Sequence, residues 1–226
     1  FMQINNETRL YSASDICNFL ECQHLTATDL INLVTPLNKA ADSEDNQLIQ
    51  NKGLEHEAAY LESLKKSNAV IADLSGNNHK SLAEKIDATR KAMESGADIL
   101  FQATLQDGCY VGHADFLRKV PYPSDLGDYS YEVIDTKLAK TAKAKFLVQM
   151  ALYSRLLKVS QGVAPHYMHV VLGDPAKTEK TYRVADYADY LESVLKRFEA
   201  FVALQEHPET YPDPCEHCKF CSWRNI

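Results

Sequence analysis

Apolar residues recur at two different spacings along the chain, and the spacing changes after Gly96. Helical spacing, with apolar residues three or four positions apart, predicts helices at 12–34, 51–68, 81–95, 143–160 and 185–205. Alternation or short apolar runs between turn residues predict strands at 68–78, 98–106, 109–120, 129–139, 165–173 and 180–184. The Asp107-Gly108 pair joins the second and third of these strands, which indicates a hairpin.

The order of these elements predicts an α/β protein. Helices precede a hairpin, which is followed by a strand, a helix, two strands and a last helix, so we expect parallel and antiparallel strands in one sheet. One domain is expected, with an N-terminal helical part at 1–50, a core at 51–205 and a cysteine-rich segment at 206–226. The polar stretch 41–47 is expected to be a loop. The buried side of the second helix is expected to carry Leu54, Ala58, Leu61 and Leu64.

The overall charge narrows the choice of partners only a little. With 24 Lys and Arg against 31 Asp and Glu, the formal net charge is −7, which disfavours a general coat for nucleic acid. A nuclease stays open, because acidic residues gathered around metal ions add negative charge that the ions reverse locally. The sequence has no long apolar run and no signal pattern, so we expect a cytoplasmic protein that does not span a membrane.

The strand at 129–139 ends with an acid and a lysine. Side chains in a strand alternate between its faces, so Asp135 and Lys137 project from the same face. If this strand pairs with the hairpin, Asp115 converges on them. Two carboxylates beside a lysine are costly to bury unless a cation lies between them, and oxygen ligands suit Mg²⁺ or Mn²⁺. The alternative is an ordinary ion pair at an exposed strand edge.

Two further features point toward the same strand end. Gln149 and Tyr153 are four residues apart, so both face one side of the helix that follows. Taken alone, they are more simply a core tyrosine beside a solvated glutamine. His56 lies on an early helix, where a lone histidine is more often structural than a metal ligand. Its neighbours Glu55 and Glu57 are expected to be solvated.

Four short motifs occur in order, and together they resemble the RecB-type branch of the PD-(D/E)xK nuclease superfamily. They are G-x2-H, G-x2-D, D-x-K and Q-x3-Y, carried by Gly53 and His56, Gly112 and Asp115, Asp135 and Lys137, and Gln149 and Tyr153. The resemblance covers nearly the whole chain and implies a restriction-endonuclease-like core, with a mixed central sheet flanked by helices. The chain differs from many relatives at Asp135, where they carry Glu.

This resemblance implies a role for each matching residue. His56, Asp115 and Asp135 would bind the metal together with the backbone carbonyl of Thr136. Lys137 would be the catalytic lysine. The Q-x3-Y pair, Gln149 and Tyr153, would position the lysine or the DNA phosphate. The chain is expected to be the N-terminal part of a longer protein that continues into an RNase-H-like or helicase domain.

Three of the six cysteines form a double C-x2-C, which is metal-ligand spacing: Cys215, Cys218 and Cys221. In similar nucleases, AddB and the CRISPR-associated RecB-like exonucleases, an iron–sulfur cluster joins one N-terminal cysteine to three C-terminal ones. The resemblance therefore implies Cys22 with the last two cysteines, and a fourth ligand that is either Cys215 or lies beyond Ile226. We expect a [4Fe–4S] cluster, with Zn²⁺ as the alternative, because a Pro-rich tail has little other means of becoming ordered.

Lys140, Lys143 and Lys145 follow the strand that carries the acid and the lysine, and they either track a DNA backbone or form a solubilising loop. The combined expectation is a Mg²⁺- or Mn²⁺-dependent deoxyribonuclease that hydrolyses phosphodiester bonds through a metal-activated water. It would act as an exonuclease on single-stranded or end-containing DNA, and RNA stays open as a substrate. The alternative is a nuclease-fold module that binds nucleic acid or a partner domain without cutting.

Overall fold

In the computed structural model of the protein, residues 2–5, 8–41, 43–77, 80–176, 178–204 and 209–226 are described. The strands are β1 (Gln3–Asn5), β2 (Thr8–Ser12), β3 (Ile71–Asp73), β4 (Ile99–Asp107), β5 (Tyr110–Val120), β6 (Ser130–Lys137), β7 (Tyr167–Leu172) and β8 (Glu179–Arg183). The helices are α1 (Ala13–Glu21), α2 (Gln23–Val34), α3 (Glu44–Lys65), α4 (Leu82–Glu94), α5 (Ala144–Gln161) and α6 (Ala185–Val202), with short 3₁₀ turns η1 (Ser75–Asn77) and η2 (Glu216–Phe220). Three predictions fall partly outside the described residues. They concern position 42 of the expected loop, position 78 of the expected turn and the expected boundary at 205–206.

The strands form a mixed sheet, which confirms the predicted α/β class. Its main order is β1-β2-β5-β6-β7-β8, while β4 pairs with β5 and β3 pairs with β4. The pairs β2–β5, β3–β4 and β6–β7 are parallel, whereas β4–β5, β5–β6 and β7–β8 are antiparallel. The predicted hairpin is β4–β5, and Gly108 in its turn adopts a positive φ of 55° that glycine accommodates easily.

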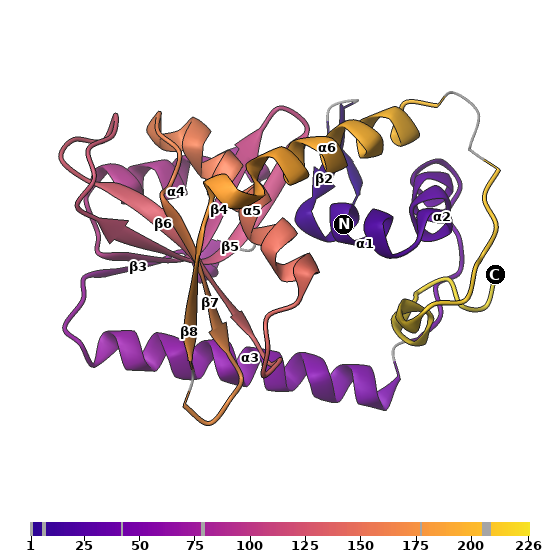
Figure 1. Ribbon diagram of the computed structural model, residues 1–226, viewed down its shortest axis with the longest axis horizontal. Coiled ribbons are helices and arrows are strands. Elements are labelled where there is room, and N and C mark those ends of the chain that lie inside the picture. The colour runs from indigo at the N-terminus through magenta and orange to yellow at the C-terminus, as the bar shows by residue number, and fades with distance from the viewer. Residues whose placement is uncertain (1, 6–7, 42, 78–79, 177, 205–208) are drawn as a thin grey trace.

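Helices cover both faces of the sheet (Figure 1). α3 lies along one face, where Leu61 packs against Phe116 and Ile134. On the opposite face, Met93 of α4 and Leu152 of α5 are buried in a larger core. α1, α2 and the C-terminal segment gather beyond one end of the sheet. Within the described ranges, no helix is both long and apolar enough to cross a membrane.

One edge of β5 changes partner halfway along the strand, and this change positions the candidate site. Tyr110 and Val111 pair with β2, whereas Phe116 and the residues that follow it pair with β6. Asp115 immediately precedes the first β6 pair, so it stands where β2 and β6 separate. Because a strand does not fill this part of the edge, side chains complete the hydrogen bonding there.

The prediction of one helix over 12–34 is wrong, because the chain breaks at Cys22 into α1 and α2. Cys22 is extended, with φ −159° and ψ 110°. Its N–H ends α1 by donating to the Asn18 carbonyl, and its Sγ accepts the Leu25 N–H at 3.4 Å to begin α2. No Gly or Pro marks the break, so the helical spacing of apolar residues runs through it.

Two other stretches are more ordered than expected. β1 and β2 were not predicted, since each is short and β2 gains its stability from pairing with β5, which is distant in sequence. α3 begins inside the expected loop, because Ser43 accepts the Asn46 N–H at 3.2 Å and caps the helix there. The expected buried side of α3 is also wrong in part: Leu61 is buried, but Leu54 is 65% exposed.

The C-terminal segment is anchored by Trp223. Its indole N–H donates to Oδ1 of Asp29 in α2 at 2.8 Å, and its ring is buried. The Ala40 N–H also donates to the Ser222 carbonyl at 2.8 Å. An aromatic anchor and backbone hydrogen bonds therefore contribute to the order of this segment, and metal binding by its cysteines stays a prediction.

Candidate functional site

The expected acids meet where β5 and β6 run side by side. Oδ2 of Asp115 accepts the backbone N–H of Thr136 at 2.9 Å and its hydroxyl at 3.0 Å. These bonds bring the side chain of Asp115 across to the end of β6, next to Asp135. The sheet register therefore places both carboxylates at one level, as the alternation of side chains along the two strands predicts.

Asp135 and Lys137 form a buried ion pair on the same face of β6. Nζ of Lys137 lies 2.7 Å from Oδ2 of Asp135, whose side chain is 1% exposed. This ion pair is the polar contact of Oδ2, and no further donor reaches it within the described part of the chain. Burial raises the pKa of Asp135, and the neighbouring charge of Asp115 raises it further. Burial alone lowers the pKa of Lys137, but Asp135 and Asp115 outweigh it and the net shift is upward.

Gln149 and Tyr153 of α5 reach the same acid. The amide of Gln149 donates to the Tyr153 hydroxyl at 3.1 Å and to Oδ1 of Asp135 at 3.4 Å. Tyr153 is buried, and burial together with the Asp135 charge raises the pKa of its phenol. The spacing of four residues thus places both side chains on the side of α5 that faces the end of β6.

Gly112 has a packing role beneath this tyrosine. A Cβ at Gly112 would lie 2.7 Å from Cδ1 of Tyr153 and 2.8 Å from Cδ1 of Leu156, closer than side-chain atoms tolerate. The glycine of the G-x2-D motif is therefore required by α5, which lies directly on β5. Gly53 of the G-x2-H motif differs, because a Cβ there would meet open space.

His56 projects from α3 to the neighbouring strand, β7. Its Nε2 lies 3.2 Å from the carbonyl oxygen of Val171, the register partner of Thr136. Because a carbonyl can only accept, Nε2 is the donor in this contact, and in the neutral imidazole Nδ1 would then have the lone pair for a metal. The imidazole therefore lies beside the end of β6.

Glu57 was expected to be solvated, and this expectation is wrong. Its Oε1 accepts a short hydrogen bond from the amide of Gln102 on β4. Burial raises its pKa to about 7, and the charge of Asp115 contributes to the shift. Its neighbour Glu55 is exposed, as expected, and pairs with Lys52 at 2.7 Å. The misleading signal was Leu54, which suggested that a different side of α3 meets the sheet.

Gln102 has an unusual backbone conformation. Its φ is +59°, although it lies within β4 and is not a glycine. A left-handed conformation costs an ordinary residue about 1–2 kcal/mol, and such strain tends to occur at functional sites. The flanking residues Phe101 and Ala103 pair with Phe116 and Ala114, so Gln102 stands opposite Asp115 without a shift in register.

The donor set suits a hard divalent cation, although it is not preassembled. Among the residues that the structure describes, no three His, Cys, Asp or Glu side chains lie close enough to hold a metal ion in their present positions. Oδ2 of Asp135 is buried and pairs with the ammonium of Lys137, so it already lies in an environment that favours a positive charge. Carboxylates, an imidazole nitrogen and a backbone carbonyl at one strand end fit Mg²⁺ or Mn²⁺.

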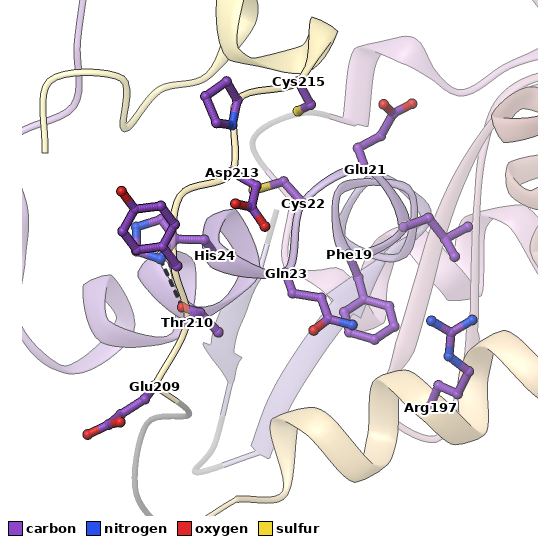
Figure 2. Close-up of a pocket in the computed structure, with 13 residues that line it drawn as sticks. Phe19, Glu21, Cys22, Gln23, His24, Arg197, Glu209, Thr210, Asp213 and Cys215 are labelled. Atoms are coloured by element: carbon purple, nitrogen blue, oxygen red, sulfur yellow. Dashed lines mark hydrogen bonds between the residues drawn. The ribbon is translucent and has the colours of Figure 1, made fainter.

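Four of the six cysteines, Cys22, Cys215, Cys218 and Cys221, lie near the α1–α2 junction and the C-terminal segment. Cys22 and Cys215 border a polar cavity of about 470 Å³ between the α1–α2 junction, α6 and the C-terminal segment (Figure 2). Sγ of Cys215 lies 3.9 Å from Sγ of Cys218. Burial raises the pKa of Cys221, and the thiols of Cys22 and Cys218 add to that shift, so these groups interact electrostatically.

This cysteine spacing fits a thiolate-bound metal only in part. Four thiolates around zinc, each about 2.3 Å from the metal, would lie about 3.8 Å apart, and the Cys215–Cys218 pair matches that spacing. Thiolates bound to separate irons of a cubane point away from one another and lie farther apart. The two C-terminal cysteines as they stand therefore fit zinc more closely, while the sequence spacing favours iron–sulfur.

Two of the three lysines expected to bind DNA are exposed, Lys140 and Lys143. Lys145 is partly buried, and its Nζ lies 3.4 Å from Oε1 of Glu21. Lys143 is also the residue at which α5 begins. The two exposed lysines are therefore better placed than Lys145 to meet a phosphate backbone.

Comparison with known proteins adds little to this geometry. No family model matches the chain, and no curated protein matches it. The crystal structure of SSO0001 is similar at a TM-score of 0.35 and 13% sequence identity, over 96% of this chain and 85% of that chain. A similarity this low supports no statement about fold or function, so the resemblance to RecB-type nucleases stays a prediction.

Proposed function

We propose that the protein is a metal-dependent DNA nuclease of the RecB-type PD-(D/E)xK kind. The observation that carries the proposal is the convergence of Asp115, the buried Asp135 and Lys137 at adjoining strand ends. Burying two acids beside one lysine is unfavourable for stability alone, and a divalent cation would offset the surplus negative charge. Phosphodiester hydrolysis is the chemistry that such an arrangement serves.

The residues that would hold the cation are Asp115, Asp135, Nδ1 of His56 and the carbonyl of Thr136. When bound, Mg²⁺ or Mn²⁺ would acidify a coordinated water and offset charge on the phosphate. Thr136 fixes the Asp115 carboxylate through two hydrogen bonds, and Gln149 fixes Oδ1 of Asp135. Each acid is therefore oriented by the chain itself.

Lys137 would act as a cation rather than as a base. The acids beside it raise its pKa, so it keeps its proton at neutral pH. An ammonium held at this position can donate to the attacking water or to a phosphate oxygen as negative charge develops. Tyr153 accepts a hydrogen bond from Gln149 and so helps hold the glutamine that supports Asp135.

The substrate we propose is single-stranded or end-containing DNA. Lys140 and Lys143 are exposed in the segment that leads from β6 to α5, where they can follow a phosphate backbone. Because the whole chain carries a net charge of −7, binding would rely on this local patch and on the bound cation. We therefore expect binding to weaken steeply as salt is raised.

The cysteines would form a second metal centre that joins α1 and α2 to the C-terminal segment. Cys22, Cys215, Cys218 and Cys221 are the proposed ligands, with a [4Fe–4S] cluster or zinc as the bound group. Elemental analysis and visible absorption of anaerobically purified protein distinguish the two. Cys215→Ser should lose the metal, whereas Cys109→Ser, in the distant hairpin, should keep it.

The nuclease is tested by incubating end-labelled single- and double-stranded DNA with Mn²⁺ or Mg²⁺. The wild-type protein should cut, and Lys137→Ala and Asp115→Ala should not. Cutting that survives in both variants would show that another site is responsible. If wild-type protein with its cysteine site filled binds DNA but never cuts, the chain is a non-cleaving nucleic-acid-binding module instead.

A further inference from the structure

Neighbouring residues of α3 reach to opposite sides of the candidate site. His56 extends to the carbonyl of Val171 on β7, while Glu57 extends to Gln102 on β4. Because β5 and β6 lie between β4 and β7 in the sheet, these two side chains flank the strands that carry Asp115 and Asp135. α3 therefore brings a second side chain, Glu57, toward the strands of the site. It lies on the β4 side, whereas His56 lies on the β7 side.

The strained backbone of Gln102 is what aims its side chain at Glu57. Phe101 packs on the α3 face of the sheet, so in a regular strand Gln102 would point to the opposite face. The positive φ of 59° turns its amide back toward α3, where it donates to Oε1 of Glu57. Gln102 donates to Oε1 of the Glu57 carboxylate and not to Oε2.

The local charges do not balance without a cation. The carboxylates of Glu57, Asp115 and Asp135 interact electrostatically, and Lys137 is the cation that interacts with all three. Oδ2 of Asp135 is buried, and beyond its ion pair with Lys137 no donor among the described residues reaches it. A cation that draws Glu57 and Asp115 toward Asp135 would balance the remaining acid charge.

We propose that Glu57 is an additional ligand of the divalent cation, and that Gln102 is the residue that positions it. The inference rests on the proposed nuclease function, since it concerns the same metal. It adds a carboxylate on α3 to the ligands on β5 and β6, so the cation would be held from both layers of the fold. Carboxylate oxygen is the donor type that Mg²⁺ and Mn²⁺ prefer.

The first experiment measures Mn²⁺ binding without DNA, by electron paramagnetic resonance of the free ion. Glu57→Gln keeps the shape of the side chain and should weaken Mn²⁺ binding by about tenfold or more. Glu55→Gln, two residues away on the exposed side of α3, is the matched control and should bind within about twofold of wild type.

Thermal unfolding separates a ligand from a merely structural residue. Without metal, Glu57→Gln should melt at the wild-type temperature or higher, because a repelled carboxylate has been removed. The rise in melting temperature caused by Mn²⁺ should shrink. A structural role would give the reverse, with a lower metal-free melting temperature and an unchanged rise. If Glu57→Gln does not fold, Glu57→Asp, which withdraws the oxygens by one methylene, takes its place.

Gln102→Gly tests the positioning role. Glycine accepts the positive φ, so the metal-free protein should melt at the wild-type temperature or above, while Mn²⁺ binding weakens severalfold. Wild-type Mn²⁺ affinity in both Glu57→Gln and Gln102→Gly, with cutting intact, overturns the inference and leaves the nuclease proposal standing. A wild-type protein that neither binds Mn²⁺ nor cuts DNA overturns the nuclease proposal, and this inference with it.

Discussion

Two clusters of charged side chains lie on the same strands, each built around a buried acid, and they differ in how their charges balance. The carboxylate cluster consists of Glu57, Asp115, Asp135 and Lys137, and the histidine cluster consists of Arg118, Glu132, His169 and Glu179. β5 and β6 contribute to both, from opposite faces, because residues an odd number apart in a strand point opposite ways. The two clusters differ in whether their acids are balanced by basic side chains of the protein itself.

The histidine cluster is balanced and fully bonded. His169 lies 2.9 Å from Oε2 of Glu132 and 3.0 Å from Oε1 of Glu179. Arg118 donates to both oxygens of Glu179, at 2.8 and 3.2 Å. Two acids thus face two basic side chains, whereas the carboxylate cluster sets three acids against one lysine, which pairs directly with Asp135. Stability explains the first cluster, whereas the second agrees with the proposed cation site.

Asp115→Asn should give the largest effect, and it should separate activity from stability. Removing one ligand charge should lower the rate of DNA cleavage by about 10²- to 10⁴-fold. The free energy of unfolding without metal should stay the same or rise, because the asparagine oxygen can still accept from Thr136 while repulsion with Asp135 falls. Urea unfolding and a cleavage time course measure the two quantities, and a large loss of stability would contradict the comparison.

Glu132→Ala, in contrast, should lower stability. It removes the acceptor of the Tyr167 backbone N–H and one of the two carboxylates that His169 contacts, which should cost about 3–5 kcal/mol of unfolding free energy. The control is Glu192→Ala, whose exposed pairing with Arg155 at 3.6 Å should be worth less than about 1 kcal/mol. Equal costs in the two variants, measured by urea unfolding, would mean that the histidine cluster adds no net stability.

The two motif glycines offer a smaller, matched test. Gly112→Ala should cost about 1–3 kcal/mol, because the new methyl would clash with Tyr153 and Leu156, and it should slow cleavage by moving Tyr153. Gly53→Ala has open space and removes a helix glycine, so it should gain up to about 1 kcal/mol. If Gly53→Ala gains stability but cuts poorly, the open space at Gly53 admits the substrate.

The parts of the site that follow regular periods could be predicted from the sequence. Asp135 and Lys137 share a face because strands alternate, and Gln149 meets Tyr153 because helices repeat every four residues or so. The sheet class followed from the order of the elements, since mixed strands with intervening helices leave few alternatives. Local rules were sufficient wherever the backbone was regular.

The parts that depend on irregular backbone or distant pairing could not be predicted. Gln102 reaches Glu57 only because its φ is positive, and glutamine gives no signal for that conformation. The break at Cys22 uses a thiol as a cap, which is not a recognised start signal. Trp223 was the available signal for an anchored C-terminal segment, since a lone tryptophan seldom stays exposed.

The pH dependence of stability should give the smallest effect, and it should isolate the histidine cluster. Burial lowers the pKa of His169, but Glu132 and Glu179 outweigh it, so the folded value is raised. The contribution of His169 is therefore complete below its unfolded pKa of about 6.5 and is lost as pH rises through the folded value. His169 and Arg118 lower the pKa of Glu179 to about 2, so the contribution of Glu179 is present above about pH 4.5 and is lost as pH falls toward 2.

The measurable quantity is the difference in unfolding free energy between wild type and His169→Gln, followed by urea titration across pH. It should be largest between about pH 4.5 and 6.5, where both groups carry their charges, and it should shrink above that range as His169 loses its proton. Taking the difference removes the carboxylate cluster, which is present in both proteins. A difference that stays flat from about pH 5 to 9 would mean that His169 is neutral when folded, and the histidine cluster would then be unbalanced like its counterpart across the sheet.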